Sequence, residues 1–208
     1  MTAAESGSAD KIASLVDDSK ADVKIANEHG LTALHFVSTP EAARALVQRG
    51  ADIEAKARDS WHSAHETPLM LAIRRSNVAV IKELAALGAD LDADDSAPVK
   101  RCIDHPFGQS FKKAVMAALL AAGAHVDGVS GAPPIFFAAE KRELDAVRFL
   151  CDNGANLAIT VSRGGGPQET VLAMLMRLHL ARTLRYPGHP PLYEAVIDEL
   201  RARNAPLA

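Results

Sequence analysis

A short glycine-containing segment recurs along this 208-residue chain and constrains its fold more than any other feature. Each full copy places Gly before Ala and a polar residue, and each follows an apolar run with helical spacing. A Gly directly after such a run commonly ends a helix in the left-handed conformation. The copies are Gly50-Ala51-Asp52-Ile53, Gly88-Ala89-Asp90-Leu91, Gly123-Ala124-His125-Val126 and Gly154-Ala155-Asn156-Leu157, with Ala21-Asp22-Val23 as a shortened one.

A second recurring segment opens the units. In Thr67-Pro68-Leu69 the Thr can cap free N–H groups and the Pro fits a first helical turn. Related openings are Thr32-Ala33-Leu34-His35, Pro133-Pro134-Ile135-Phe136 and Thr170-Val171-Leu172-Ala173. The distance from Thr67 to Gly88 is 21 residues, and the distance from Pro133 to Gly154 is also 21. This matched spacing predicts a repeated pair of helices.

Together, the two segments resemble the ankyrin repeat family, whose unit of about 33 residues opens with T-P-L-H-x-A. The resemblance covers nearly the whole chain after Lys11. It implies an all-α, ankyrin-type helical repeat solenoid, with two antiparallel helices per unit and a hairpin-like finger between units. It also implies that Thr32 and His35 are structural and bond within and between units. Each helix pair has an apolar side that the next pair must cover.

We expect residues 1–10 to be a flexible N-terminus and residues 11–208 to be a single repeat domain. A half unit at 11–23 uses Ile12, Leu15 and Val16 as its apolar face. The full units are predicted at 32–53, 67–91, 97–126, 133–157 and 170–207.

Two units depart from the pattern. The first is short, so that Thr39-Pro40 starts its second helix directly. The third opens at Ala97-Pro98-Val99 and is interrupted at residues 106–108. In the last helix, Arg201 stands where earlier units place Val47, Ala85 or Leu120. A charge at that inward position indicates a terminal cap, and we expect a whole array and not a fragment.

Composition agrees with closely packed helices and excludes several classes of function. Hydrophobic residues make up 48% of the chain and aromatic residues only 4%, whereas β-sheet cores usually need more aromatic side chains. The net charge of -3 and the lack of a basic stripe argue against nucleic-acid binding. No apolar run is long enough to cross a membrane, and the first ten residues lack the pattern of a secretory signal.

The cysteines and the basic residues indicate where the chain comes from. Cys102 and Cys151 form no disulfide framework, so we expect reduced cysteines in a cytoplasmic protein. Arg outnumbers Lys 14 to 9 and Ala is abundant, which indicates a bacterial source.

The finger between Ala51 and Thr67 is five residues longer than the one between Ala21 and Thr32, and loops carry function more often than cores do. Its extra residues include Arg58, Asp59, Trp61 and His62, and Trp61 is the only tryptophan in the chain. Trp and Arg are enriched where proteins bind one another. The sequence leaves two roles open for Trp61, a contact with a partner or a seal over the helices.

The fourth finger is also longer than the norm, by four residues, and contains Arg163 and the run Gly164-Gly165-Gly166-Pro167. The run lacks the Lys-Ser/Thr ending of a phosphate-binding loop, so we interpret it as a flexible finger whose Arg163 is a further partner-contact candidate.

His62, His65 and Glu66 raise the question of a metal site. The H-x-x-H spacing suits a helix, but this segment is predicted to be a loop, and no third ligand is apparent. The sequence therefore predicts no metal and no cofactor.

The function that these features favour is a non-catalytic adaptor or scaffold. A partner protein would bind to the fingers and to the groove that they form with the first helices, and the protein itself is expected to be a monomer. A narrower alternative is an inhibitor or immunity-type protein that occludes a partner enzyme or toxin. The rival class, an enzyme, needs a catalytic constellation, and no nucleophile and base can be paired without joining distant residues.

Overall fold

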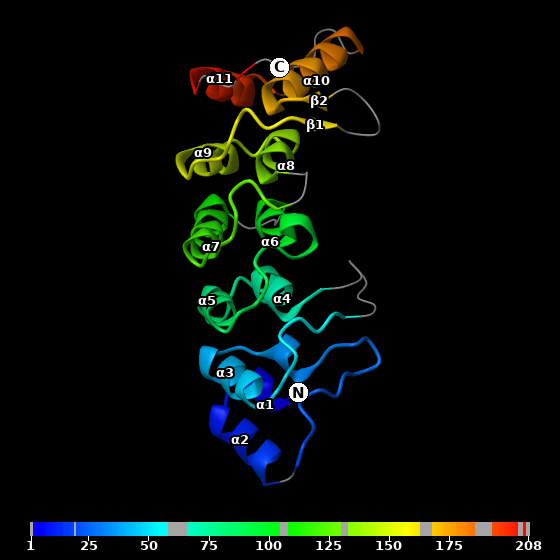
Figure 1. The fold of residues 1–208 in the computed structure, drawn as a ribbon, viewed down its shortest axis with the longest axis vertical. Coiled ribbons are helices and arrows are strands. Elements are labelled where there is room, and N and C mark those ends of the chain that lie inside the picture. Colours follow the sequence, from blue (N-terminus) through cyan, green and yellow to red (C-terminus); the bar gives the residue numbers. More distant parts are fainter. Residues whose placement is uncertain are drawn as a thin grey trace. The chain divides into compact units, whose positions relative to one another are not determined.

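The computed structural model describes residues 2–18, 20–57, 66–104, 108–129, 133–162, 168–185, 193–203 and 206. Helices follow one another in pairs along the chain, as Figure 1 shows. Within the described residues the only strands are β1 (Val161–Ser162) and β2 (Gln168–Glu169), which pair antiparallel. The predicted all-α class is therefore confirmed.

The first helices are short. They are α1 (Thr2–Glu5) and α2 (Ala9–Asp17), then the 3-10 helix η1 (Ala33–Phe36) with α3 (Pro40–Gln48), then α4 (Pro68–Arg74) with α5 (Val78–Ala86). The remaining pairs are α6 (Ala93–Asp104) with α7 (Gln109–Ala121), α8 (Pro134–Glu140) with α9 (Leu144–Asp152), and α10 (Val171–Arg185) with α11 (Glu194–Ala202).

These elements divide into two compact units. The first contains residues 1–93 and 114–124, and the second contains residues 94–113 and 125–208. The boundary falls inside α7, which gives its first residues to the second unit and the rest to the first.

In the first unit the second helix of each pair packs on the second helix of the next. Helix α3 lies between α2 and α5, and η1 packs against α4. The core between them is aliphatic, with Leu34, Leu69, Ile81 and Leu84 almost without solvent exposure.

Ion pairs tie the same row of helices together at the surface of the first unit. Arg49 binds Asp17 at 2.7 Å and Arg44 binds Glu83 at 2.8 Å.

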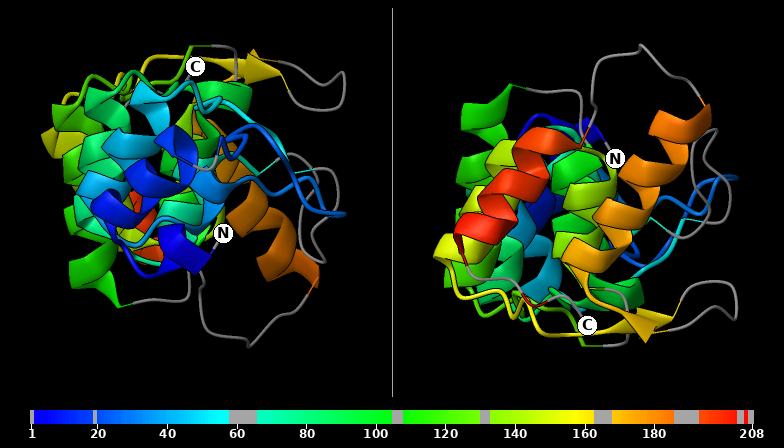
Figure 2. Two further views of the ribbon diagram at one scale, coloured as in Figure 1. Left: turned by 90° about the horizontal axis from the view of Figure 1, so that it is seen from below. Right: turned by 90° about the horizontal axis from the view of Figure 1, so that it is seen from above.

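The second unit repeats the arrangement. Helix α8 packs on α9, α10 on α11, and each of α10 and α11 contacts the corresponding helix of the preceding pair. Figure 2 shows α10 and α11 side by side from above. Ile135, Leu150, Leu175 and Leu200 are fully buried in this unit.

The predicted helix starts and stops hold in the structure. Thr39, Thr67 and Thr170 accept hydrogen bonds from the backbone N–H three residues later, at 3.3 Å in each case. The glycines that end the second helices have left-handed backbone: φ is +86° at Gly50, +94° at Gly88, +110° at Gly123 and +87° at Gly154. These are the conformations that a glycine adopts without strain.

The N-terminal expectation needs correction. Residues 2–5 form α1, and Ala3 and Ala4 are buried, so this part of residues 1–10 is not a flexible tail. The small alanines pack against η1, while Ser38 Oγ donates to the Glu5 carbonyl at 2.8 Å. In α2 only Ile12 is buried, and Leu15 is exposed.

The start of the third unit also differs from the prediction. Helix α6 begins at Ala93 and passes through Pro98, although we expected it to open at Ala97-Pro98-Val99. Proline fixes φ near the helical value and removes one N–H, so it weakens a helix without forbidding it. The helix continues beyond the proline to Asp104, and the Cys102 thiol donates to the Pro98 carbonyl at 3.2 Å. Only Asp90 to Asp92 therefore separate the Gly88-Ala89 stop from α6.

No helix in the described part of the chain has both the length and the apolarity that crossing a bilayer demands.

Candidate partner-binding site

The finger between Ala51 and Thr67, called the second finger below, has a stem that is fixed at both of its ends. Ala57 is the last described residue before the finger and Glu66 is the first one after it. The Ala57 N–H donates to the Glu66 carbonyl at 3.1 Å, and both residues are buried. One backbone hydrogen bond therefore joins the two ends of the stem.

Glu66 carries two further contacts that hold the stem to the helices. Its carbonyl oxygen also lies 3.1 Å from Nε2 of His35, in the preceding unit. Its carboxylate binds Arg74 at the end of α4, at 2.9 Å. Backbone and side chain of one residue thus join the stem to η1 and α4.

The protonation state of His35 follows from its neighbours. The Thr32 N–H donates to Nδ1 at 3.0 Å, so Nδ1 is an acceptor and Nε2 carries the proton that it donates to Glu66. Burial lowers the pKa of His35 from its ordinary value of 6.5, although the bond to the Glu66 backbone acts in the opposite direction. The predicted structural role of Thr32 and His35 within and between units is confirmed.

The predicted contact residues Arg58, Asp59, Trp61 and His62 lie outside the described residues, and so does Arg163. The structure places only the segments that flank them. For the first four these are Ala57 and Glu66. For Arg163 they are the ends of β1 and β2, where Ser162 pairs with Gln168.

Of the three residues considered as metal ligands, Glu66 alone is among the described residues. Its carboxylate is engaged by Arg74, while His62 and His65 fall outside the described segments. Within the described ranges, no group of three or more His, Cys, Asp or Glu side chains has a metal-binding arrangement.

The first finger presents an apolar side chain that the sequence analysis did not single out. Ile25 is 63% exposed. The turn beside it is held by the Asn27 side chain, whose Oδ1 accepts from the N–H groups of His29 at 3.0 Å and Leu31 at 2.9 Å. The sequence feature that could have pointed to Ile25 is its position as an apolar residue among the polar residues of the finger.

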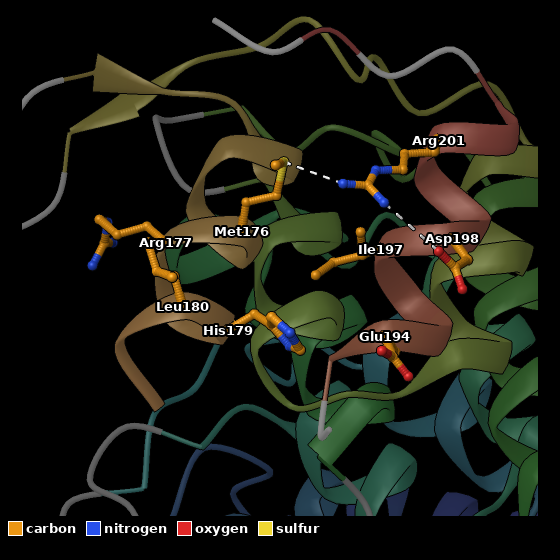
Figure 3. A pocket seen from close by; sticks show the side chains of 8 residues that line it. All are labelled: Met176, Arg177, His179, Leu180, Glu194, Ile197, Asp198 and Arg201. Atoms are coloured by element: carbon orange, nitrogen blue, oxygen red, sulfur yellow. Dashed lines mark hydrogen bonds and ion pairs between the residues drawn. The ribbon is translucent and has the colours of Figure 1, made fainter. Parts of the chain in front are cut away.

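A groove between α10 and α11 is a second feature that the sequence analysis missed. It has a volume of about 550 Å³ and is open to solvent. Figure 3 shows Met176 and Ile197 approaching each other from the two helices, with Arg201 above them. Leu180, on the same groove, is 60% exposed. Helix α10 has 15 residues, whereas the corresponding helices α4 and α8 have 7. This extra length was the feature that could have pointed to the groove.

Neither cysteine is placed for nucleophilic chemistry. Burial raises the pKa of Cys102 to about 12, and burial also raises the pKa of the half-buried Cys151. A thiol with a raised pKa is a poor source of thiolate at neutral pH.

Comparisons with known proteins agree with this geometry. Residues 1–95 match a family model described as ankyrin repeats in three copies. Over 115 residues the chain is 29% identical to an Arabidopsis thaliana protein named as an E3 ubiquitin-protein ligase, XBAT31. That alignment covers 49% of this chain and 25% of the plant protein, so the chain spans about a quarter of the length of this relative.

A solved structure extends the similarity beyond residue 95. The ankyrin repeat domain of Bcl-3, a member of the IkappaB family, matches with a TM-score of 0.67 and 24% identity over 96% of both chains. At that identity the match establishes the fold. Residues 1–95 therefore match ankyrin repeats, and the chain has the ankyrin repeat fold over almost its whole length.

Proposed function

We propose that this chain is a non-catalytic protein-binding module, an adaptor or scaffold whose fingers contact a partner protein. Ankyrin repeats are modules for protein–protein interaction. The observation that carries the proposal for this chain is the fixed stem of the second finger. The Ala57–Glu66 hydrogen bond and the contacts to His35 and Arg74 fix the two ends of the stem before a partner binds. Preorganisation lowers the entropic cost of binding.

The residues proposed to touch the partner are Arg58, Asp59, Trp61 and His62 on the second finger, with Arg163 as an additional contact. A Trp flanked by charged residues has the composition of a binding hot spot and its rim. The exposed Ile25 of the first finger adds an apolar contact in the same compact unit.

Cys102 and Cys151 are both free thiols, as is usual in a reducing compartment, and we propose a cytoplasmic location.

The test of this proposal compares affinity and stability in the same variants. A partner is first isolated by crosslinking and affinity capture from the host and then purified. Its dissociation constant is measured for wild type and for Trp61→Ala. If Trp61 is an anchor, binding weakens by roughly 2 kcal/mol or more while the thermal melt stays the same. Lys82→Ala, an exposed change on α5, is the control and leaves both quantities unchanged.

Two results would contradict the proposal that the second finger contacts the partner protein. A lower melting temperature with unchanged affinity identifies Trp61 as a seal over the helices. Unchanged affinity and stability exclude both roles, and binding is then attributed to Ile25 or Arg163, which Ile25→Ala and Arg163→Ala test in the same assay.

A further inference from the structure

The groove between α10 and α11 is open to solvent. The buried sides of these helices, with Leu175 and Leu200, pack within the second unit. The groove is lined instead by Met176, Leu180, Ile197 and a set of charged side chains. Leu180 is 60% exposed beside this apolar floor.

Charged residues follow the groove along α11 in a pattern that is complementary to itself. Glu194 and Arg201 both line it and stand seven residues apart, so they share one face of the helix and lie about 10 Å apart along its axis. Ile197 and Asp198 lie at the midpoint between them. A twofold rotation about an axis perpendicular to α11, through this midpoint, exchanges the positions of Glu194 and Arg201.

The Arg201 guanidinium makes only long contacts with the described residues. The nearest are the Met176 sulfur at 4.0 Å and an Asp198 carboxylate oxygen at 3.9 Å. Charge-assisted hydrogen bonds are normally about 2.7–2.9 Å long. In the same unit Arg148 reaches Glu199 at 2.8 Å and Arg203 reaches Asp152 at 2.8 Å. Arg201 therefore stands over the groove with room for a closer carboxylate, and its side chain is 55% exposed.

From these observations we infer that the groove binds a second copy of this chain. The two α11 helices pack antiparallel across a twofold axis near Ile197 and Asp198. Glu194 of each copy then faces Arg201 of the other, and both ion pairs form at once. The apolar floor with Met176 and Leu180 is covered in the same step. A twofold interface requires a self-complementary surface, and the Glu194 and Arg201 pair has that property. The inference goes beyond the proposed partner binding and differs from the monomer expected from the sequence.

The experiment measures the self-association of the full chain by sedimentation over a range of concentrations. Wild type shows a reversible monomer–dimer equilibrium that weakens with added salt, because exposed ion pairs are screened. Glu194→Arg and Arg201→Glu each place like charges in contact twice per dimer, so each raises the dissociation constant by at least about tenfold. The double variant Glu194→Arg/Arg201→Glu exchanges the charges and restores the wild-type constant.

Controls separate this effect from general changes in charge or folding. Glu28→Arg makes the same charge change in the first finger, where the Glu28 side chain is 86% exposed, and leaves association unchanged. Thermal melts confirm that all variants fold. Leu180→Glu weakens the dimer without touching the ion pairs.

Three outcomes overturn the inference. They are a wild-type chain that stays monomeric at every concentration, single variants that dimerise like wild type, and a double variant that remains as weak as the single ones. In the first case the groove is left for a helix of another protein or a small apolar ligand.

Discussion

Nε2 of His35 donates a hydrogen bond of 3.1 Å to the carbonyl oxygen of Glu66, which lies 31 residues further along the chain. The same carbonyl accepts the N–H of Ala57, so this one oxygen is shared by the opening segment of one repeat and the stem of the next finger. The arrangement needs a neutral imidazole, because the Thr32 N–H donates to Nδ1. Protonation of His35 would turn that acceptor into a donor facing a donor.

Stability is therefore expected to depend on pH through His35. Burial lowers its pKa in the folded state below the ordinary value of 6.5, so at acidic pH the unfolded chain binds a proton that the folded chain resists. The contribution of the neutral ring is fully present above pH 6.5 and is lost as the pH falls below it. Urea melts of wild type and His35→Gln between pH 8 and pH 5 measure this difference.

The variant is expected to be less stable by about 1–3 kcal/mol at pH 8, because its shorter side chain cannot serve both Thr32 and Glu66. The gap between the two proteins narrows toward pH 5. Parallel curves over this range would show that His35 does not titrate differently in the folded state.

Helix ends were predictable because their signals are local. A Thr that caps the third following N–H and a Gly with positive φ act within a few residues, so Thr67 and Gly88 mark the limits of their helix pair without knowledge of the fold. The start of α6 was not predictable in this way. Pro98 has the same local signature as Pro68 at a first turn, and only the surrounding structure places it inside a helix.

The candidate site was only partly predictable, for a similar reason. The excess length of the second finger could be read from the spacing of its flanking motifs. The contacts that fix its stem could not, because Glu66 reaches His35 from another unit and Arg74 across eight residues. Neither spacing belongs to the i,i+3 or i,i+4 pairs that a helix pattern reveals. The groove by α10 depends on which side of a helix stays uncovered, and the sequence does not show that.

Truncation of the core leucines tests the register of the repeats. Leu84 and Leu150 stand four residues before Gly88 and Gly154 and have no solvent exposure, as their shared register predicts. Leu84→Ala and Leu150→Ala should each destabilise the protein by about 2–5 kcal/mol through loss of packing and cavity formation. Denaturant melts provide the measurement. Ile25→Ala, at an exposed aliphatic residue, serves as the control and should change stability by no more than about 0.5 kcal/mol.

The glycine that ends α5 gives a test of backbone conformation alone. Gly88 has φ of +94°, and a Cβ built on it meets no atom within 4 Å. Gly88→Ala should therefore cost about 1–2 kcal/mol from left-handed strain, without any steric clash. Gly108 also has open space around a Cβ but lacks a positive φ. Gly108→Ala should be neutral or stabilising by about 0.4–1 kcal/mol. Equal losses at the two positions would contradict this explanation.

A buried cation in the second unit leads to the last prediction. The Lys112 side chain in α7 is 6% exposed, and its Nζ donates to the Ile103 carbonyl at 2.8 Å and to Glu143 at 2.7 Å. Glu143, which precedes α9, keeps 24% of its side chain in contact with solvent. The two partners of this ion pair are therefore hydrated unequally, and removing one should cost more than removing the other.

Glu143→Ala leaves the buried ammonium without its carboxylate and should destabilise the protein by about 3–5 kcal/mol. Lys112→Met replaces the cation with an apolar chain of similar length. It should cost only about 1–3 kcal/mol, because it leaves the Ile103 carbonyl without that donor while water can still reach Glu143. In the double variant no uncompensated cation remains, so its stability should be close to that of Lys112→Met. Urea melts of the four proteins complete the cycle, and additive losses would mean that water already neutralises the cost of the buried charge.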